Sequence, residues 1–171
     1  MERPTDTEYA SFYARYVALV PETDILAVLE PQVEEVRRLL APVSAEKEAY
    51  RYAEGKWSVR QVLGHLVDAE RVFGYRTFCF SRGEQAALPS FDENQYVAGA
   101  RSNGVSLREL VEELALVRRA NLAFLRRLDA REWGLVGTAS GKPVSVRALA
   151  WVMAGHPRHH LQILRERYGI S

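Results

Sequence analysis

The sequence predicts an all-α protein built as a four-helix bundle. Four long stretches repeat apolar side chains at intervals of three and four residues, the spacing that gives a helix one apolar face. Ser58, Ser106 and Ser145 precede three of these stretches, where a hydroxyl group can cap the first turn. Only residues 134–144 have the pattern of a hairpin. Amphipathic helices of this length pack most simply as a bundle.

The amino-terminal part of the chain is expected to form one short helix and one long helix. Aromatic residues at helical spacing predict the short helix over residues 7–19, and Pro21 ends it. The long helix begins near Thr23 and is closed by Pro42. Pro31 inside it lacks a backbone N–H and clashes with the preceding turn, so a kink or a restart is expected there. The apolar face of this helix comprises Ile25, Leu29, Val33, Val36 and Leu40.

A second long helix follows residues 43–57, which are expected to be a connector. Ser58 and Gln61 have the spacing of a capping box, in which each side chain bonds the backbone of the other. The helix is expected to run to about Ser81, because Gly83 just beyond it is typical of a helix end. Its apolar face comprises Val59, Val62, Leu63, Leu66, Ala69, Val72 and Phe73.

The third long helix is preceded by a predicted long loop over residues 84–104, where proline, glycine and asparagine interrupt any period. Ser106 and Glu109 form another capping-box pattern. Asp129 is expected either to end the helix or to cap a short turn over residues 130–133. Asn121 is the polar exception on an apolar seam that otherwise comprises Leu107, Leu110, Leu114, Val117, Phe124 and Leu128.

The last helix is expected to begin after Ser145 and to end at Tyr168, with Gly169 as its carboxyl cap. Before it, Ser140 and Gly141 are a plausible hairpin tip between short extended arms. The second and third long helices, and the third and fourth, are joined by connections long enough to cross the bundle. An up-down-up-down order is therefore not required.

Length and charge limit the classes of function. The 171 residues fit one domain over 1–171, and 47% of them are hydrophobic. A net charge of +1 provides no strong field for nucleic acid or a membrane surface, so neither partner is expected. Cys79 is the single cysteine, which excludes an intrachain disulfide. No apolar run could span a bilayer and the first residues lack the apolar core of a signal peptide, so a cytoplasmic protein is expected.

Three of the four histidines lie between residues 156 and 160. His156 and His160 are four residues apart, which places both imidazoles on one helix face, one turn apart. His159 shares that face less well and could line a site or face solvent. Pro157 stands between the pair and should kink the helix and leave the carbonyl of Met153 without its helical donor.

His65, on the apolar stripe of the second long helix, needs a polar partner. We predict that His65, His156 and His160 hold one divalent metal ion. Three protein ligands leave a coordination position open, as in catalytic rather than structural sites. Asp68 could be a fourth ligand or an acceptor that orients an imidazole, although a solvated carboxylate is the alternative. A buried core histidine and a solvated histidine pair are the alternatives to the metal site.

The residues resemble the DinB-like (DinB/YfiT) metalloenzyme superfamily, of the DinB_2 type, over nearly the whole chain. The resemblance implies a bundle in up-down-down-up order, often a homodimer, with the metal on His65, His156 and His160. Zinc, nickel and iron are the metals to expect, and Pro157 departs from the family's pattern. The matching segments are Gly55–Arg60 (GKWSVR), His65–Arg71 (HLVDAER), Tyr75-Arg76, Pro89–Asp92 (PSFD) and Gly155-His156 with His159-His160.

The resemblance also implies a chemistry. Similar proteins include S-transferases that use bacillithiol or a related low-molecular-weight thiol, and a mycothiol-dependent isomerase. A metal-dependent transferase is therefore expected, with a small-molecule substrate and a thiol cofactor, because a metal lowers the pKa of a thiol. One alternative is a metal-dependent hydrolase, for which Asp68 is the candidate general base. The other is a non-catalytic bundle that binds metal or dimerises.

Three further groups of polar residues have two interpretations each. Asp92, Glu93, Asn94 and Tyr96 could reach over the open metal position, or serve only as turn residues. Arg76 could meet an anionic group of a substrate, or form a salt bridge. The pairs Arg118-Arg119 and Arg126-Arg127 are expected to lie on a solvated face.

Overall fold

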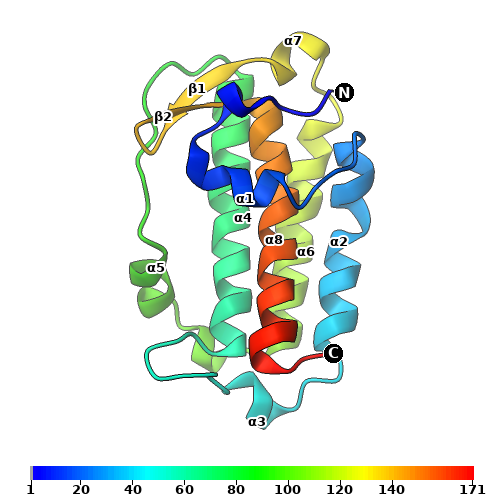
Figure 1. The fold of residues 1–171 in the computed structure, drawn as a ribbon, viewed down its shortest axis with the longest axis vertical. Coiled ribbons are helices and arrows are strands. Elements are labelled where there is room, and N and C mark those ends of the chain that lie inside the picture. Colours follow the sequence, from blue (N-terminus) through cyan, green and yellow to red (C-terminus); the bar gives the residue numbers. More distant parts are fainter. Residues whose placement is uncertain (1) are drawn as a thin grey trace.

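The computed structural model describes residues 2–171, apart from the side chain of Asn103, and confirms the predicted all-α class (Figure 1). Its four long helices form a bundle, and the remaining elements cover the two ends and one side. None of the described helices has the length and apolarity needed to cross a membrane. The long helices are α2 (Ile25–Leu40), α4 (Val59–Ser81), α6 (Leu107–Leu125) and α8 (Val146–Tyr168).

The helices follow an up-down-down-up order, as the resemblance implies. In Figure 1, α2 and α8 run from the top of the view to the bottom, whereas α4 and α6 run from the bottom to the top. Helix α4 packs between α6 and α8, and α2 closes the bundle against the same two helices. The long connection from α4 to α6 returns along the bundle and makes this order possible, whereas the connection from α6 to α8 stays at one end.

The three serine residues predicted to cap helices do so, whereas α2, predicted to begin near Thr23, is capped by Asp24. The Ser58 hydroxyl accepts a hydrogen bond from the Gln61 N–H at 3.2 Å, and the Ser58 N–H donates to the Gln61 side chain at 3.0 Å. Ser106 and Glu109 form the same reciprocal pair at α6. Ser145 caps α8. The carboxyl end of α8 is also as predicted, because Gly169 has φ 63°, in the left-handed region that favours glycine.

The two predicted connectors contain short helices that the sequence did not indicate. Residues 84–104 contain α5 (Glu93–Gly99) and η3 (Ser102–Gly104), and residues 43–57 contain α3 (Ala45–Glu48). Asp92 starts α5, since its carboxylate accepts hydrogen bonds from the N–H groups of Asn94 and Gln95 at 2.8 and 3.1 Å. A helix of one or two turns is too short to show a period, so its residues looked like plain turn formers.

The connection from α6 to α8 begins earlier than predicted and contains the expected hairpin. Helix α6 ends at Leu125, and Asp129 caps a separate short helix, α7 (Ala130–Trp133), which confirms the second of the two interpretations of Asp129. Strands β1 (Val136–Ala139) and β2 (Lys142–Ser145) pair antiparallel around Ser140 and Gly141, as predicted. Residues 82–106, which connect α4 to α6 and are called the crossing segment below, join this hairpin. The Leu88 N–H donates to the Thr138 carbonyl at 2.8 Å.

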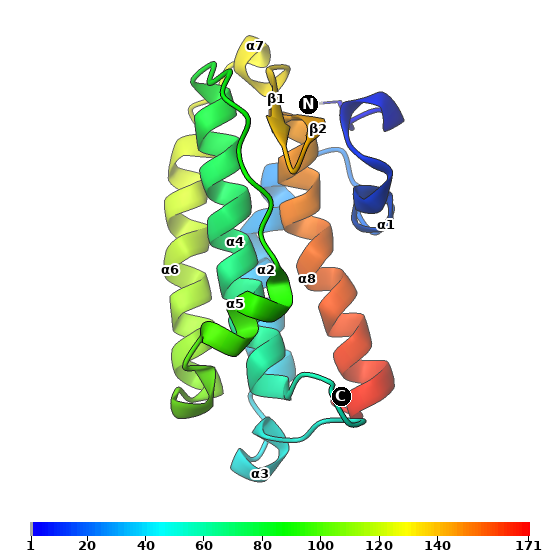
Figure 2. The ribbon, with the colours of Figure 1, turned by 90° about the vertical axis from the view of Figure 1, so that its left-hand side faces the viewer.

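The amino-terminal segment is not the single helix predicted over residues 7–19. It forms η1 (Asp6–Glu8), η2 (Ser11–Tyr13) and α1 (Ala14–Val17), which cross the outer side of α8 (Figures 1 and 2). Gly155 permits the crossing, since a Cβ atom there would lie only 2.0 Å from the Tyr16 carbonyl oxygen. The aromatic spacing therefore serves contact with α8 rather than one continuous helix.

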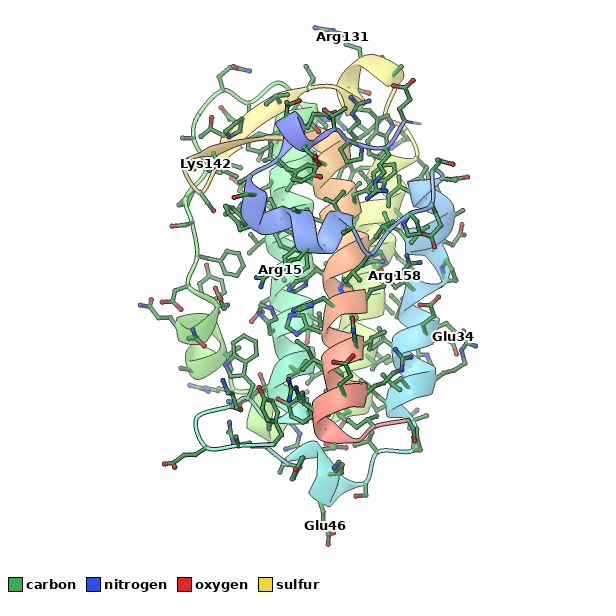
Figure 3. The ribbon with its side chains drawn as sticks, viewed as in Figure 1. Arg15, Glu34, Glu46, Arg131, Lys142 and Arg158 are labelled. Atoms are coloured by element: carbon green, nitrogen blue, oxygen red, sulfur yellow. The ribbon has the colours of Figure 1, made fainter. Side chains whose placement is uncertain are left out.

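A buried polar network links the long helices, and it corrects the expectation that Arg118 lies on a solvated face. Charged side chains such as Glu34, Arg131 and Lys142 point outward (Figure 3). Arg118, by contrast, is only 2% exposed and forms a bidentate ion pair with Glu70 at 2.7 and 2.8 Å. A buried guanidinium needs such a partner, because leaving water costs several kcal/mol.

Neither internal proline divides its helix in two. Helix α2 continues through Pro31, so the restart considered for it does not occur, and α8 continues through Pro157. The carbonyl of Met153, which Pro157 deprives of a helical donor, accepts a hydrogen bond from Arg118 at 3.2 Å. The buried polar network therefore satisfies the Met153 carbonyl, which Pro157 leaves without a helical donor.

Candidate metal centre

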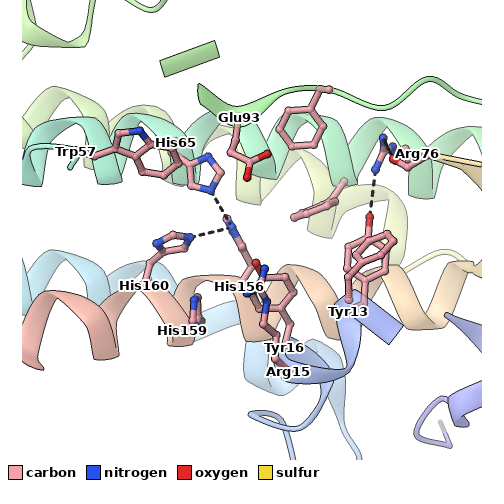
Figure 4. A pocket seen from close by; sticks show the side chains of 14 residues that line it. Tyr13, Arg15, Tyr16, Trp57, His65, Arg76, Glu93, His156, His159 and His160 are labelled. Carbon is pink, nitrogen blue, oxygen red and sulfur yellow. Dashed lines mark hydrogen bonds between the residues drawn. The ribbon is translucent and has the colours of Figure 1, made fainter. Parts of the chain in front are cut away.

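The structure brings together the three histidines that the sequence predicted as a group. His65 comes from α4, and His156 and His160 from α8, and their side chains converge in the space between these helices (Figure 4). The Nε2 atom of His156 lies 3.0 Å from that of His65 and 3.1 Å from that of His160. All three residues are buried, with exposed fractions of 6%, 4% and 9% for His65, His156 and His160.

Aromatic rings hold the imidazoles in place. The Trp57 ring lies 4.8 Å from that of His65, centre to centre, and the Tyr16 ring lies 5.2 Å from that of His156. Phe73 packs against His156 from α4 at 5.6 Å. These contacts restrict ring rotation, so the three Nε2 atoms stay directed at one another.

Burial keeps the imidazoles neutral. It lowers the pKa of His65 to about 4, although the carboxylate of Glu93 acts in the opposite direction. For His156 and His160, burial and then the neighbouring histidines lower the pKa well below the ordinary value. At neutral pH each ring therefore keeps a free nitrogen lone pair, the form of histidine that binds a metal.

The donor set fits a divalent cation. Within the described residues, each of the three Nε2 atoms has only another Nε2 of the same group as a hydrogen-bond partner. Their ligand atoms all lie within 4.8 Å of one another. Nitrogen ligands about 2.0–2.1 Å from a tetrahedral zinc ion would be about 3.3 Å apart, close to the two spacings here. Three lone pairs that face one another in a buried space are satisfied together by one cation.

Two other residues singled out in the sequence do not belong to the set of converging ligand atoms. Asp68 is half-buried on α4, and it is not among the side chains whose ligand atoms converge. Burial raises its pKa, and the charged groups that act on it are Arg71 and Glu113. His159 is half-buried and lines the adjoining cavity, with its ring 5.4 Å from that of Tyr16.

A cavity of about 290 Å³ opens beside the three histidines. Glu93, on α5, lines it, and in Figure 4 its carboxylate points toward the space beside His65 and His156. Of the two interpretations of this loop, Glu93 fits the first because it lines the cavity, whereas Asp92 fits the second as a helix cap. Other walls come from the amino-terminal segment, α4, the crossing segment and the hairpin, and they include Tyr13, Arg15, Tyr16, Arg76, Phe91 and Ser140.

Arg15 and Tyr16 are pocket residues that the sequence did not reveal. Their segment follows no long helical period, and its position depends on a contact with a helix about 140 residues further along the chain. Gly155 next to His156 was the one available signal, because glycine within a helix often permits the close approach of another segment.

A family model described as the DinB superfamily matches residues 29–164. The chain belongs to the DinB superfamily. The match includes His65, His156 and His160, and it begins after the amino-terminal segment that lines the cavity. The DinB-superfamily part of the chain therefore supplies all three converging imidazoles, while one wall of the cavity comes from outside it.

Two solved structures share the fold of this DinB-superfamily chain. YfiT from Bacillus subtilis, described as a probable metal-dependent hydrolase with an unusual four-helix bundle topology, has a TM-score of 0.78 and 18% identity over 98% of this chain and 94% of its own. The mycothiol-dependent maleylpyruvate isomerase has a TM-score of 0.67 and 14% identity, over 90% of this chain and 63% of its own. No curated protein matches the sequence.

Proposed function

We propose that this chain is a divalent-metal-dependent enzyme that hydrolyses a small substrate in the cavity beside the three histidines. One observation carries the proposal: a carboxylate, Glu93, faces the open side of a buried set of three neutral imidazoles. A metal ligand set with an open position and a nearby general base is the combination that metal-dependent hydrolysis requires. The resemblance of the fold to YfiT, described as a probable metal-dependent hydrolase, is consistent with it.

Each group in the cavity has a defined task. His65, His156 and His160 would hold the ion, which when bound lowers the pKa of water and polarises the substrate. Glu93 accepts a proton from the attacking water at a carboxylate oxygen. The water oxygen forms the new bond to the substrate, and the same carboxyl group returns the proton to the leaving group. The rings of Trp57 and Phe73 exclude bulk water from this exchange.

Glu93 replaces Asp68 as the proposed general base. Asp68 was the candidate that helix spacing offered, but its carboxyl group lies outside the set of converging ligand atoms and is influenced by Arg71 and Glu113. Glu93 lines the same cavity as the histidines and acts electrostatically on His65. We therefore expect Asp68→Asn to leave hydrolysis nearly unchanged.

Thiol transfer is the second candidate, and the resemblance of the fold to a mycothiol-dependent isomerase favours it. A bacillithiol-type thiol could occupy the open position beside the histidines, where the ion would lower its pKa. Glu93 would then accept the thiol proton instead of a water proton. The thiolate sulfur would bond to an electrophilic carbon of the substrate, and the leaving group would depart with the bonding electrons.

The two candidates are separated by assaying the zinc- or nickel-loaded protein with and without a thiol. We expect hydrolysis of at least one member of a panel of chromogenic esters, amides and phosphate esters without thiol. Glu93→Gln should lower kcat roughly 100-fold, because a general base contributes about that much, while the metal content stays unchanged. Glu84→Gln, an exposed residue of the same crossing segment, is the control. Equal turnover by wild type and Glu93→Gln would refute the hydrolase, and turnover only with thiol would favour the transferase.

A homodimer, which the family resemblance implies, is part of the proposal. The surface of the described chain offers several exposed large apolar side chains, among them Tyr75 and Phe78 on α4. Sedimentation equilibrium of the purified protein would test this directly, since a single species of about 19.4 kDa would exclude a stable dimer.

A further inference from the structure

Arg76 is a buried guanidinium without a carboxylate partner. It is 2% exposed on α4, and its N–H groups donate to the Tyr13 hydroxyl at 3.2 Å, the Pro89 carbonyl at 2.7 Å and the Ser140 hydroxyl at 3.1 Å. The ring of Phe91 lies 5.7 Å away. All of these groups are neutral. The salt bridge considered for Arg76 is absent from the ion pairs among the described residues.

Arg118 provides an internal comparison, because it is equally buried. The chain gives Arg118 a full counter-charge, the bidentate carboxylate of Glu70. Arginine stays protonated inside proteins, so Arg76 carries a positive charge that the described protein does not neutralise. A buried charge of this kind is costly unless something pairs with it. The difference between the two arginines indicates that the partner of Arg76 is a ligand.

The position of Arg76 places that ligand in the cavity of the histidines. Arg76 lines the same cavity as His65, eleven residues away on nearly the same face of α4, which is about 16 Å along the axis. In Figure 4, Arg76 lies at one end of the pocket and the three histidines lie toward the other. Glu93 is at the histidine end, so its negative charge would direct an anionic group toward Arg76.

Ser140 supports the same interpretation through its backbone. It has φ 53°, and within the described residues it is the only non-glycine residue with positive φ. A two-residue hairpin turn has positive φ at both of its central residues, here Ser140 and Gly141. At this hairpin tip it places the Ser140 hydroxyl both against Arg76 and on the cavity wall.

We propose that Arg76, Tyr13 and Ser140 form a subsite that binds an oxyanion group, a carboxylate or a phosphate, of the substrate. A guanidinium carries five N–H donors and Arg76 uses three of them in these bonds, so N–H groups of Arg76 remain for such an oxyanion. Burial raises the pKa of Tyr13 even though Arg76 acts in the opposite direction, so its hydroxyl keeps the proton that it could donate. The substrate is then an elongated anion whose reacting bond lies several bonds from the charged end. The position of that reacting bond rests on the proposed function, whereas the subsite itself does not.

The test follows the arginine Nε–H signals of the ¹⁵N-labelled protein by NMR while propionate or inorganic phosphate is added, with and without zinc. Arg76→Lys assigns the Arg76 signal. We expect a saturable shift of that signal with at least one of the two anions, and none with chloride at the same ionic strength. The anion that binds more tightly, propionate or phosphate, identifies the class of oxyanion. Because the readout is at Arg76, an anion bound to zinc alone would not produce the shift.

Calorimetry with matched variants completes the test. Arg76→Gln should weaken binding of the better anion at least ten-fold, whereas Arg126→Gln, which removes an exposed positive charge just beyond the end of α6, should not change it. No saturable shift in the wild type, or equal affinity in Arg76→Gln, would overturn the subsite. If Arg76→Gln does not fold, the wild-type titration decides alone. If the metal site fails but the subsite is real, the protein will contain no metal, yet the Arg76 signal will still shift when the anion is added.

Discussion

At the scale of single residues, Arg118 on α6 contacts the other three helices of the bundle. Besides the carboxylate of Glu70 on α4, it donates to the Leu29 carbonyl on α2 at 3.0 Å and to the Met153 carbonyl on α8 at 3.2 Å. The last of these is the acceptor that Pro157 leaves open. One side chain therefore satisfies several buried groups, and no replacement of similar size can do the same.

Replacing Arg118 should be strongly destabilising. Arg118→Met leaves the Glu70 carboxylate buried without its ion partner, which typically costs about 3–5 kcal/mol. Urea unfolding followed by circular dichroism measures the loss. Arg119→Met is the matched control, because Arg119 is the adjacent exposed residue, and it should change the free energy of unfolding by less than about 0.5 kcal/mol. Similar losses in the two variants would contradict this view of the network.

The residue scale also shows what helical spacing can and cannot reveal. His156 and His160 are four apart on one helix, and His65 is a polar residue on an apolar stripe, so their meeting was predictable. Arg118 and Arg119 are adjacent and chemically identical, and only the packing of α2, α4 and α8 makes one buried and the other exposed. Sequence alone therefore missed the core arginine.

At the scale of elements, the amino-terminal segment is fastened to α8 at two points. Glu8 on η1 accepts hydrogen bonds from Arg147 at 2.6 Å through both carboxylate oxygens, and one from the Ser145 hydroxyl at 2.8 Å. Further along, Tyr16 rests on the bare backbone of Gly155. Between these points the segment forms the wall of the cavity, so its attachment governs access to the histidines.

The first attachment should depend on pH. Burial raises the pKa of Glu8, but hydrogen bonds from Arg147, from the Thr5 backbone and from Ser145 outweigh it and lower the pKa to about 2. A lowered pKa stabilises the fold above the unfolded value near 4.5, and this stabilisation is lost as pH falls from there toward 2. Glu8→Gln should lower the free energy of unfolding by on the order of 2 kcal/mol at pH 7.

Urea unfolding of wild type and Glu8→Gln between pH 7 and pH 3 measures this dependence. The difference between the two proteins should shrink as the solution becomes more acidic. Glu54→Gln, at an exposed loop residue, is the control and should behave as wild type at every pH. A difference that stays constant down to pH 3 would show that the Glu8 charge is not the cause.

The second attachment should fail when Gly155 gains a side chain. The new Cβ atom of Gly155→Ala would lie 2.0 Å from the Tyr16 carbonyl oxygen, so α1 must move away from α8. We expect faster hydrogen exchange in residues 11–17 and a loss of about 1–3 kcal/mol, the usual cost of overpacking. Gly134→Ala is the control, since its nearest contact would be an ordinary 3.5 Å. Unchanged exchange in Gly155→Ala would contradict the close approach.

Elements with their own local signals were predictable, and those that depend on tertiary contacts were not. The starts of α4, α6 and α8 follow from a serine at the cap, and the hairpin tip follows from Ser140 and Gly141. Helix α5 is too short to show a period, and the aromatic spacing of the amino-terminal segment predicted one helix where the structure has η1, η2 and α1. Their positions, and hence the roles of Glu93 and Tyr16, are set by packing against α4 and α8.

At the scale of the whole molecule, the order of the helices creates the cavity. The parallel arrangement of α4 and α6 requires a long return segment, and that segment carries Glu93 past the histidines (Figure 2). The second long connection brings Ser140 to the opposite end. A bundle with short loops would contain the same three histidines without these walls. Helical periodicity predicts the bundle, whereas its up-down-down-up order could be expected only from the family resemblance.

The central claim is that His65, His156 and His160 hold one divalent metal ion. It is tested most directly by elemental analysis of untagged protein in three forms. These are wild type, the variant with all three histidines replaced by alanine, and His159→Ala, which changes the one remaining histidine of the chain. About one equivalent of metal in wild type and His159→Ala, and none in the triple variant, is the predicted result. Equal metal content in the wild type and the triple variant would contradict the account.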